Sequence, residues 1–390
     1  MKRKIYLLIL SIISLTAIIF QTAFSTICLA DEIEINCKSK SAYLMDYNSK
    51  TVIYSKNEKE RLPIASMCKV MTLLLCFDAL SNNIIREDEV VVVSNNASSM
   101  GGSQVFLEEN GEYLVSELLK SIVVASANDA CVAMAEKLCG SEEIFVNKMN
   151  EKCAELNMDN TKFVNCTGLP KPEQYSCAKD VATMFSELIN HKEYFNYSQI
   201  WMDKVNHPHD RFTEISNTNK LIRFYKGCDA GKTGFTSEAG HCLVASAIKG
   251  DMRLISVVIK APDSKTRFND VSSMFNYGFA NYENKIIVSA NKPLDLVVNV
   301  VNGKNDRLEV VAEKPLYLFS KKGIERSVEI NFAPLDKIKA PIKKGDKMGE
   351  LEIYENNIQI ASIPVLSNQD LDAKVYFDYI LDIGNNWALI

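Results

Sequence analysis

Histidine is scarce in this 390-residue chain, which contains four, at positions 191, 207, 209 and 241. The chain also lacks Gly-x-Ser-x-Gly, so a hydrolase triad built on serine and histidine is disfavoured. A glycine-rich phosphate loop, a dinucleotide fingerprint, His-Glu-x-x-His and Cys-x-x-Cys are missing too. The cluster His207-Pro-His209-Asp210 is better explained as an exposed loop than as a metal site. We therefore expect no cofactor and no metal.

Positive charge is not in excess either. The formal net charge is -5, which argues against a nucleic-acid partner, because such proteins carry basic surfaces. Charged residues make up 24% of the chain and hydrophobic residues 47%, as in ordinary globular proteins. A chain of this length buries a large core and usually forms two domains.

Residues 1–30 form a targeting segment rather than part of the fold. Three basic residues at positions 2–4 precede the apolar run Ile5–Phe20, and Cys28-Leu-Ala30 provides a small-x-small cleavage site. Ile27 precedes Cys28 where a lipid-attachment site needs a small residue, so we favour cleavage after Ala30. An uncleaved anchor is the alternative, because the apolar run is long. In both cases the body of the protein is exported and extracytoplasmic.

The cysteines need an explanation in an exported protein, because disulfides form outside the cytoplasm. Of eleven cysteines, ten remain after cleavage at Ala30, an even number that permits disulfides. They are scattered through apolar helical runs, however, without the regular spacings of a disulfide framework. Because a buried thiol behaves as a small hydrophobic group, we predict free cysteines.

Residues 31–285 have strands at both ends and helices between them. The predicted strands are Ser41–Met45, Thr51–Tyr54, His241–Ile248 and Met252–Ile259. Strands from both ends can pair in one sheet, so we expect an α+β domain with an antiparallel sheet flanked by helices.

Two further segments follow this domain. Residues 286–368 consist of short apolar runs separated by turns, which predicts a small β-sandwich that serves as a spacer or docking module. Residues 369–390 predict an amphipathic helix, in which Lys374, Asp378 and Asp382 line one stripe and apolar residues fill the rest. Such a helix can lie in a membrane interface, and packing on its own domain is the alternative.

The candidate chemistry begins at Ser66-Met-Cys-Lys69. Pro63 suits the start of a helix, and a helix from about Ala65 would place Ser66 and Lys69 on one face. A serine hydroxyl needs an adjacent base, which an amine provides when burial lowers its pKa. Backbone N–H groups at a helix start also stabilise an oxyanion. The Ser-x-x-Lys pattern alone is weak, because it recurs at Ser176, Ser246 and Ser289. Of these, Ser176 is explained as the N-cap of a following helix.

Two other short motifs strengthen this interpretation. Ser126-Ala-Asn128 lies at a break between two predicted helices, where a hydroxyl and an amide can face a cleft. Lys232-Thr233-Gly234 is unique in the chain and leads into a strand. Its lysine can bind a carboxylate and keep Lys69 neutral, its threonine offers a hydroxyl, and its glycine lets a substrate approach the strand edge.

The order and spacing of the three motifs, with 60 residues from Ser66 to Ser126 and 106 from Ser126 to Lys232, resemble the penicillin-recognising serine acyl-transferases. Within them the chain resembles the low-molecular-mass penicillin-binding proteins, D-alanyl-D-alanine carboxypeptidases. Further matching stretches are Arg61…Pro-Ile-Ala-Ser66, Ser126-Ala-Asn-Asp-Ala-Cys-Val-Ala-Met134, Tyr175-Ser-x-Ala-x-Asp180 and Met252-Arg-Leu-Ile-Ser256. The resemblance covers essentially the whole chain. It implies the fold of serine β-lactamases and penicillin-binding proteins, and a cell-wall enzyme at the outer face of the cytoplasmic membrane.

The resemblance also implies roles. Ser66 would be acylated by the penultimate D-alanine of a peptidoglycan stem peptide, with release of the terminal D-alanine. Lys69 would take the serine proton, and Ser126 would relay it to the leaving amine. Lys232 would support that network, and Asn128 would bind the substrate amide. β-Lactams, which mimic the dipeptide, would acylate Ser66 and leave slowly.

The remaining contacts follow from the third motif and the helix after it. Thr233 and Arg267 match positions that hold the substrate carboxylate, and Gly234 admits the substrate. The backbone N–H groups of Ser66 and Phe235 would form the oxyanion hole. The chain departs from the family pattern at Cys68, where threonine is common, and at Asn217, where some members have an arginine.

Two rival functions remain. A class A β-lactamase would carry Ser-Asp-Asn and a glutamate in Glu-x-x-Leu-Asn, whereas this chain has Ser-Ala-Asn and lacks the second motif. A catalytically silent wall-binding scaffold is the other rival. The six intact motif residues argue against it: Ser66, Lys69, Ser126, Asn128, Lys232 and Gly234.

Overall fold

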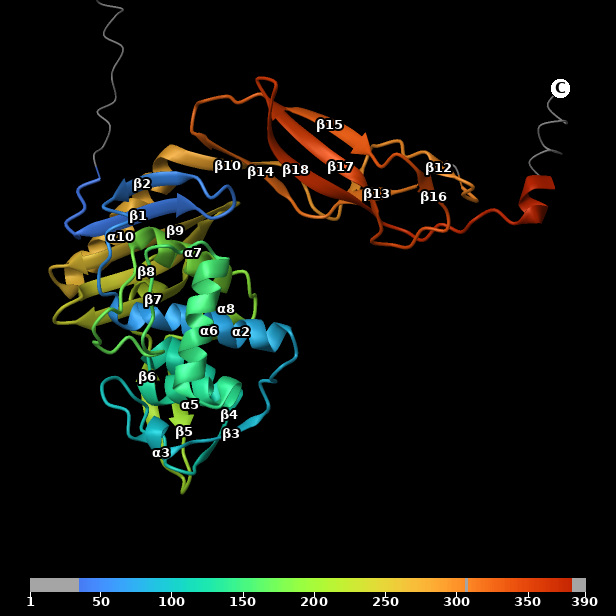
Figure 1. The fold of residues 1–390 in the computed structure, drawn as a ribbon. Helices are drawn as coiled ribbons and strands as arrows, with labels where there is room; N and C mark the ends of the chain where they lie inside the picture. The colour runs from blue at the N-terminus through green and yellow to red at the C-terminus, as the bar shows by residue number, and fades with distance from the viewer. Residues whose placement is uncertain (1–34, 306–307, 381–390) are drawn as a thin grey trace, which may run out of the picture. The chain divides into compact units, whose positions relative to one another are not determined.

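The computed structural model describes residues 35–305 and 308–380 (Figure 1). The predicted signal segment and residues 381–390 of the predicted terminal helix lie outside the described residues. Contacts divide the chain into two units, Met1–Cys37 and Lys38–Ile390, and every element below belongs to the second. No helix within the described ranges is long and apolar enough to span a bilayer.

The central sheet has five antiparallel strands in the order β2-β1-β9-β8-β7 (Figure 1). Its strands are β1 (Ser41–Asp46), β2 (Val52–Lys56), β7 (Cys228–Thr236), β8 (Gly240–Lys249) and β9 (Met252–Ala261). Strands from the two ends of the domain pair directly, since β1 runs against β9 from Ser41 opposite Ile259 to Asp46 opposite Leu254. Strand β7 forms one edge of the sheet, a position at which an extended peptide can add a strand.

Side chains alternate between the two faces of this sheet. On one face Tyr43, Met45 and Val257 join the main hydrophobic cluster, which also contains the buried residues of the central helices. On the other face Ser256 donates its hydroxyl to the Met274 sulfur in α10 at 3.8 Å. The sheet is therefore covered on both sides, and the α+β arrangement predicted from the sequence is correct.

The helical segments lie between β2 and β7, with α10 after β9. They are η1 (Ala65–Cys68), α2 (Lys69–Ser81), α3 (Asn95–Ser98), α4 (Val115–Lys120), η2 (Ser121–Ala125), α5 (Asn128–Cys139), α6 (Glu142–Glu155), α7 (Ala178–Leu188), α8 (Tyr194–Ser198), α9 (Leu221–Phe224) and α10 (Ser264–Asn281). Two small hairpins complete the domain. They are β3 (Val90–Val92) with β4 (Glu112–Leu114), and β5 (Met202–Asn206) with β6 (Phe212–Ser216).

Two local predictions were wrong. Cys177, not Ser176, is the N-cap of α7, and its sulfur accepts from the Asp180 N–H at 3.5 Å. His207 is buried rather than exposed, because its ring bonds Tyr113 Oη at 2.9 Å and Thr213 Oγ1 at 2.8 Å. The exposed-loop interpretation holds for His209 and Asp210, which form the β5–β6 turn.

The cysteines from Cys68 to Cys242 are free thiols, and all of them except Cys139 are buried. The prediction of free thiols is therefore confirmed for this stretch. Packing explains it, since Cys68, Cys76, Cys131 and Cys153 all belong to the main hydrophobic cluster.

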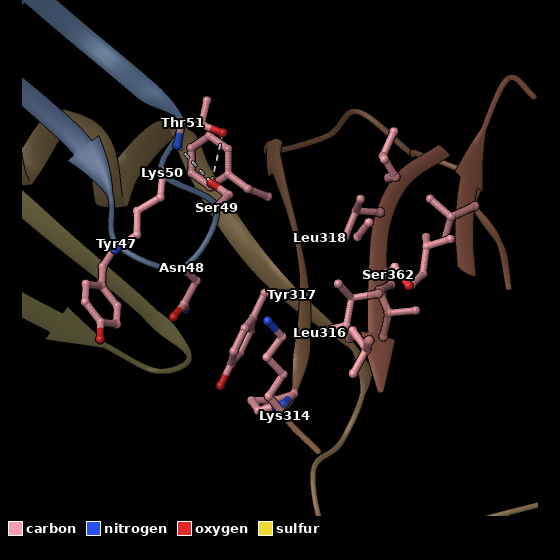
Figure 2. A pocket seen from close by; sticks show the side chains of 18 of the residues that line it. Tyr47, Asn48, Ser49, Lys50, Thr51, Lys314, Leu316, Tyr317, Leu318 and Ser362 are labelled. Atoms are coloured by element: carbon pink, nitrogen blue, oxygen red, sulfur yellow. Dashed lines mark hydrogen bonds between the residues drawn. The ribbon is translucent and has the colours of Figure 1, made fainter. Parts of the chain in front are cut away.

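The turn that joins β1 to β2 lies where Asn48-Ser-Lys50 predicts it (Figure 2). The Asp46 carboxylate accepts from the Ser49 N–H at 2.7 Å, and Ser49 Oγ donates to Thr51 Oγ1 at 2.9 Å. Lys50 has a positive φ of 57°, which reverses the chain.

The C-terminal part is β-rich, as predicted (Figure 1). Its strands are β10 (Tyr282–Val288), β11 (Pro293–Leu294), β12 (Val300–Val301), β13 (Val310–Ala312), β14 (Leu316–Lys321), β15 (Glu329–Pro334), β16 (Ile338–Lys339), β17 (Lys347–Glu355) and β18 (Ile358–Ser367). A five-stranded sheet, β11-β13-β18-β17-β15, accompanies the pairs β10-β14 and β12-β16. Val310, Ile353 and Val365 are fully buried in a separate hydrophobic cluster. Residues 376–380 are helical.

Candidate active site

Ser66 lies in a tight turn at the start of α2. The sequence predicts a helix from about Ala65, but Ala65 has a positive φ of 49° and Ala65–Cys68 form a 3-10 turn. The α-helix begins at Lys69, three residues after Ser66, and the lysine side chain reaches the serine hydroxyl. Lys69 Nζ donates to Ser66 Oγ at 3.1 Å and to the Thr167 carbonyl at 2.5 Å.

The Lys69 amine is fully buried. Burial lowers the pKa of this ammonium, because removal from water disfavours the charged form. An amine with a lowered pKa is neutral in a larger fraction of molecules near neutral pH and can accept the Ser66 proton.

Ser126 and Lys232 form a second serine–lysine pair. After α4 the chain passes through a π-helical turn, Ser121–Ala125, and Ser126 adopts a left-handed conformation with φ 62°. Such turns are frequent at functional sites. Here it breaks the helix, and Lys232 Nζ donates to Ser126 Oγ at 2.7 Å. Burial lowers the pKa of Lys232 far below its ordinary value, and the positive charge of Lys69 lowers it further. Gly234, two residues after Lys232, packs against the turn that carries Ser66, so the two pairs lie close to one another.

Two glycines hold the Ser66 turn. A Cβ atom on Gly234 would lie 2.5 Å from the Ile64 carbonyl oxygen and 3.2 Å from the Met67 nitrogen. Gly168, with φ +81°, would place a Cβ atom 2.0 Å from the Ala65 carbonyl oxygen. A side chain at either position would push β7 or the 168 loop away from Ser66.

Asn128 begins α5 and is buried. Its Nδ2 donates to the Gly101 carbonyl at 2.7 Å, and its N–H donates to the Ser103 carbonyl at 2.7 Å. Within the described ranges its Oδ1 is buried without a hydrogen-bond donor. That oxygen can accept an N–H from a substrate amide.

Arg267 reaches the third motif from α10. Its Nη1 donates to the carbonyls of Gly234 at 3.2 Å and Cys242 at 3.4 Å. Thr233 is buried in β7, one residue before Gly234. A guanidinium, a hydroxyl and the Lys232 amine at one end of the site can each donate a hydrogen bond to a carboxylate.

The Phe235 side chain is 57% exposed and stacks on His241, with ring centroids 4.3 Å apart. Its ring therefore lies at the surface, and the expected role of Phe235 depends on its backbone N–H. Cys68 is buried, and its thiol donates to the Asn165 carbonyl at 3.2 Å. Burial raises the pKa of this thiol, which disfavours a reactive thiolate beside Ser66.

Sequence reasoning missed two supports of the site. The Thr167 carbonyl receives the Lys69 amine, and the loop that carries it is fixed by Asn165, whose Oδ1 accepts from Gly168 N–H at 2.7 Å. The turn residues Gly168 and Pro170 were the available signal. Asp129 accepts from Val105 N–H and Leu107 N–H, both at 3.1 Å, and so fixes the segment that follows Ser103.

Asn217 occupies a structural position. Its Nδ2 donates to the carbonyls of Ser198 at 3.0 Å and Ile200 at 2.9 Å. The amide is therefore engaged within the fold rather than presented to a ligand.

Residues 29–263 match the protein family described as D-alanyl-D-alanine carboxypeptidase, and residues 282–373 match the C-terminal domain of penicillin-binding protein 5. The chain is 39% identical over 356 residues to the D-alanyl-D-alanine carboxypeptidase DacF of Bacillus subtilis, with 91% of each chain covered.

Solved structures give a consistent result. Penicillin-binding protein 5 from Haemophilus influenzae superposes with a TM-score of 0.68 at 29% identity, covering 86% of this chain and 98% of that one. Penicillin-binding protein D2 from Listeria monocytogenes, solved in an ampicillin-bound form, superposes with a TM-score of 0.56 at 28% identity. That comparison covers 63% of this chain and 99% of the Listeria chain.

Proposed function

The chain belongs to the D-alanyl-D-alanine carboxypeptidase family of penicillin-binding serine peptidases, and from this premise we propose how its residues perform the reaction. It is a serine-type D-Ala-D-Ala carboxypeptidase, which acts on peptidoglycan stem peptides and, as a member of this family, is a target of β-lactams. The proposal assigns each chemical step to a residue of the site.

Acylation begins at the first serine–lysine pair. The neutral Lys69 amine takes the proton of Ser66 Oγ, and the oxygen attacks the carbonyl carbon of the penultimate D-alanine. The carbonyl oxygen becomes an oxyanion, which the backbone N–H groups of Ser66 and Phe235 stabilise. The 3.1 Å separation of Lys69 Nζ and Ser66 Oγ is the single observation that carries this step.

The second pair completes the cycle. Ser126 donates its proton to the leaving amine and receives in its place the proton held by Lys69, which becomes neutral again, and the peptide C–N bond breaks to release D-alanine. Lys232, 2.7 Å from Ser126 Oγ, supports this transfer by supplying a hydrogen-bond donor. A water molecule activated by Lys69 then attacks the ester, which frees Ser66 and the shortened peptide.

Substrate orientation follows from the polar groups around the two pairs. Asn128 Oδ1 accepts an amide N–H of the peptide, and Arg267, Thr233 and Lys232 bind the terminal carboxylate. Gly234 lets the Ser66 turn pack directly against β7, beside which the peptide binds in this proposal.

Mass spectrometry of the benzylpenicillin adduct tests the assignment. We expect one penicilloyl group per chain on the peptide that contains Ser66, and a nitrocefin reaction that stops after one equivalent. Cys68→Thr is the matched control, because it removes the neighbouring thiol and should leave the adduct unchanged. Many nitrocefin turnovers would instead favour the β-lactamase. Absence of D-alanine release from diacetyl-Lys-D-Ala-D-Ala would favour the silent scaffold.

The protein belongs to an extracytoplasmic family. We further propose that it is attached to the outer face of the cytoplasmic membrane through its C-terminal segment, residues 369–390. The described part of that segment supports the proposal, because Val375, Tyr376, Phe377 and Ile380 are all exposed apolar side chains. An exposed aromatic cluster of this kind is suited to a lipid interface.

Vesicle sedimentation tests this attachment. With mature protein and phosphatidylethanolamine–phosphatidylglycerol vesicles, we expect Tyr376→Ser/Phe377→Ser to lower the bound fraction by about fivefold or more, because two interfacial aromatic anchors are lost. Val297→Ser, at another exposed apolar position in the C-terminal part, should bind like the parent protein. Equal binding of all three proteins would contradict the proposal.

A further inference from the structure

The Lys69 amine is oriented by a backbone carbonyl as well as by Ser66. Its Nζ donates to the Thr167 carbonyl at 2.5 Å and lies 3.1 Å from Ser66 Oγ. Once neutral, the amine still has N–H groups to donate and has a lone pair to accept the serine proton. An N–H bound to the Thr167 carbonyl fixes the direction of that lone pair. The position of this carbonyl therefore controls the alignment of the base.

The residue before Thr167 is fixed from three helices. The Cys166 carbonyl accepts from Thr72 Oγ1 of α2 at 2.8 Å and from the Cys131 thiol of α5 at 3.1 Å. The Cys166 N–H donates to Glu142 Oε1 of α6 at 3.0 Å, and the Cys166 thiol donates to the same oxygen at 3.2 Å. Both peptide groups of Cys166 are thus restrained, and the hydrogen bonds to α6 end on a carboxylate, which is a strong acceptor.

Glu142 lies outside the three motifs, in the partly exposed first turn of α6. Its neighbour Glu143 occupies the same turn and is exposed. A carboxylate in a first turn is ordinarily explained by its attraction to the positive end of the helix, and this explanation applies equally to both residues. The contact with Cys166 is what distinguishes Glu142.

We propose that Glu142 is a positioning residue for the catalytic base. By holding the N–H and the thiol of Cys166, it fixes the backbone that leads to the Thr167 carbonyl, and that carbonyl directs the Lys69 amine towards the serine. This role rests on the function proposed above, in which Lys69 takes the serine proton. Without Glu142 this backbone loses a restraint, and a misplacement of about 1 Å can cost about 10²-fold in rate.

Displacement of the Thr167 carbonyl also changes the charge state of Lys69. Burial lowers the pKa of Lys69, whereas a hydrogen bond from the ammonium to a carbonyl raises it by favouring the charged form. Loss of that acceptor would lower the pKa of Lys69 further, so acylation would rise at a lower pH. The other groups that act on this amine remain in Glu142 variants: the thiols of Cys68, Cys131 and Cys166, the Asp129 carboxylate and the Lys232 amine.

The pH dependence of benzylpenicillin acylation, measured before the steady state and expressed per titrated active site, tests the inference. We expect Glu142→Ala to lower the maximal rate by about tenfold and to move the midpoint of the pH limb to lower pH. Glu142→Gln removes the charge but keeps an oxygen that can accept the Cys166 N–H, so its rate and midpoint should lie close to those of the parent protein. Glu143→Ala is the matched control, because it removes the neighbouring carboxylate, and both quantities should be unchanged.

Several outcomes would overturn the role of Glu142. They are an unmoved midpoint in Glu142→Ala, the same shift in Glu143→Ala, or equal effects of Glu142→Ala and Glu142→Gln, which would assign the effect to charge. Loss of all titratable sites in Glu142→Ala alone would also overturn it, because the residue would then be required for folding. Lys69→Met separates this inference from the proposed function. A pH limb that survives in Lys69→Met refutes the base itself, whereas a limb that Lys69→Met removes and Glu142→Ala leaves in place refutes only the role of Glu142.

Discussion

Ser66→Ala is expected to abolish both penicillin labelling and D-alanine release. Ser66 Oγ is the hydroxyl that contacts Lys69, and water cannot replace an oxygen fixed 3.1 Å from its base. Removing a serine nucleophile typically costs about 10⁴-fold or more in turnover. Labelling with a fluorescent penicillin and a coupled D-alanine assay measure the two losses independently.

Ser289→Ala is the matched control for this variant. Ser289 begins another Ser-x-x-Lys, with Lys292, but it lies in the C-terminal part, far along the chain from the three motifs. That variant should label and hydrolyse like the parent protein. Labelling that persisted in Ser66→Ala would move the nucleophile to another hydroxyl. Ser126, which has its own lysine, would be the first candidate.

Lys69→Met should reduce acylation by about 10³-fold, within the range of general-base effects. Methionine fills similar volume, so the buried position is retained while the proton acceptor is lost. The pre-steady-state rate of penicillin acylation is the measurement. Lys179→Met, in the second Ser-x-x-Lys, replaces an exposed lysine on α7 and should have no effect.

The pH dependence of the acylation rate gives a sharper comparison between the parent protein and Lys69→Met. Burial lowers the pKa of Lys69, so in the parent protein the neutral, reactive amine increases as the pH rises through that lowered value. The acylation rate should therefore rise with pH and then level off. Lys69→Met should lose this limb of the profile. A limb unchanged in Lys69→Met would assign the base to another group.

The same burial affects stability. Below its folded pKa, Lys69 is charged in both folded and unfolded chains, and the cost of burying that charge is fully present. The cost disappears as the pH rises from the folded pKa to the ordinary value, because the unfolded chain binds more protons in this window. Lys69→Met should therefore unfold at a higher temperature than the parent protein near neutral pH. A lower melting temperature in a correctly folded variant would contradict the burial argument.

Local patterns in the sequence predicted the fold class, and the resemblance to a known family supplied the candidate site residues. Strand alternation and terminal strand pairs indicated the antiparallel sheet, and motif spacing selected Ser66, Ser126 and Lys232. The predicted free thiols followed from the apolar context of the cysteines. The alternation within each strand and the apolar context of each cysteine depend on neighbouring residues, so a single sequence contains them.

Features that depend on contacts between distant segments were not predicted. The 3-10 turn at Ser66 replaces the expected helix start, because Gly168 and Gly234 pack against it from distant parts of the chain. The sequence did not predict that the Thr167 carbonyl is the second acceptor of Lys69, because the two residues are far apart along the chain. His207 was assigned to the surface because its partners Tyr113 and Thr213 come from different hairpins.

The close fit of Gly168 and Gly234 around the reactive serine restricts how this enzyme can evolve under antibiotic selection. A methyl group at either position would overlap the backbone of the Ser66 turn, so the turn or the segment that carries the glycine would have to move. Escape from β-lactams by altering the backbone around Ser66 would forfeit the natural reaction as well. Adaptive change is therefore expected at side chains that do not touch the Ser66 turn.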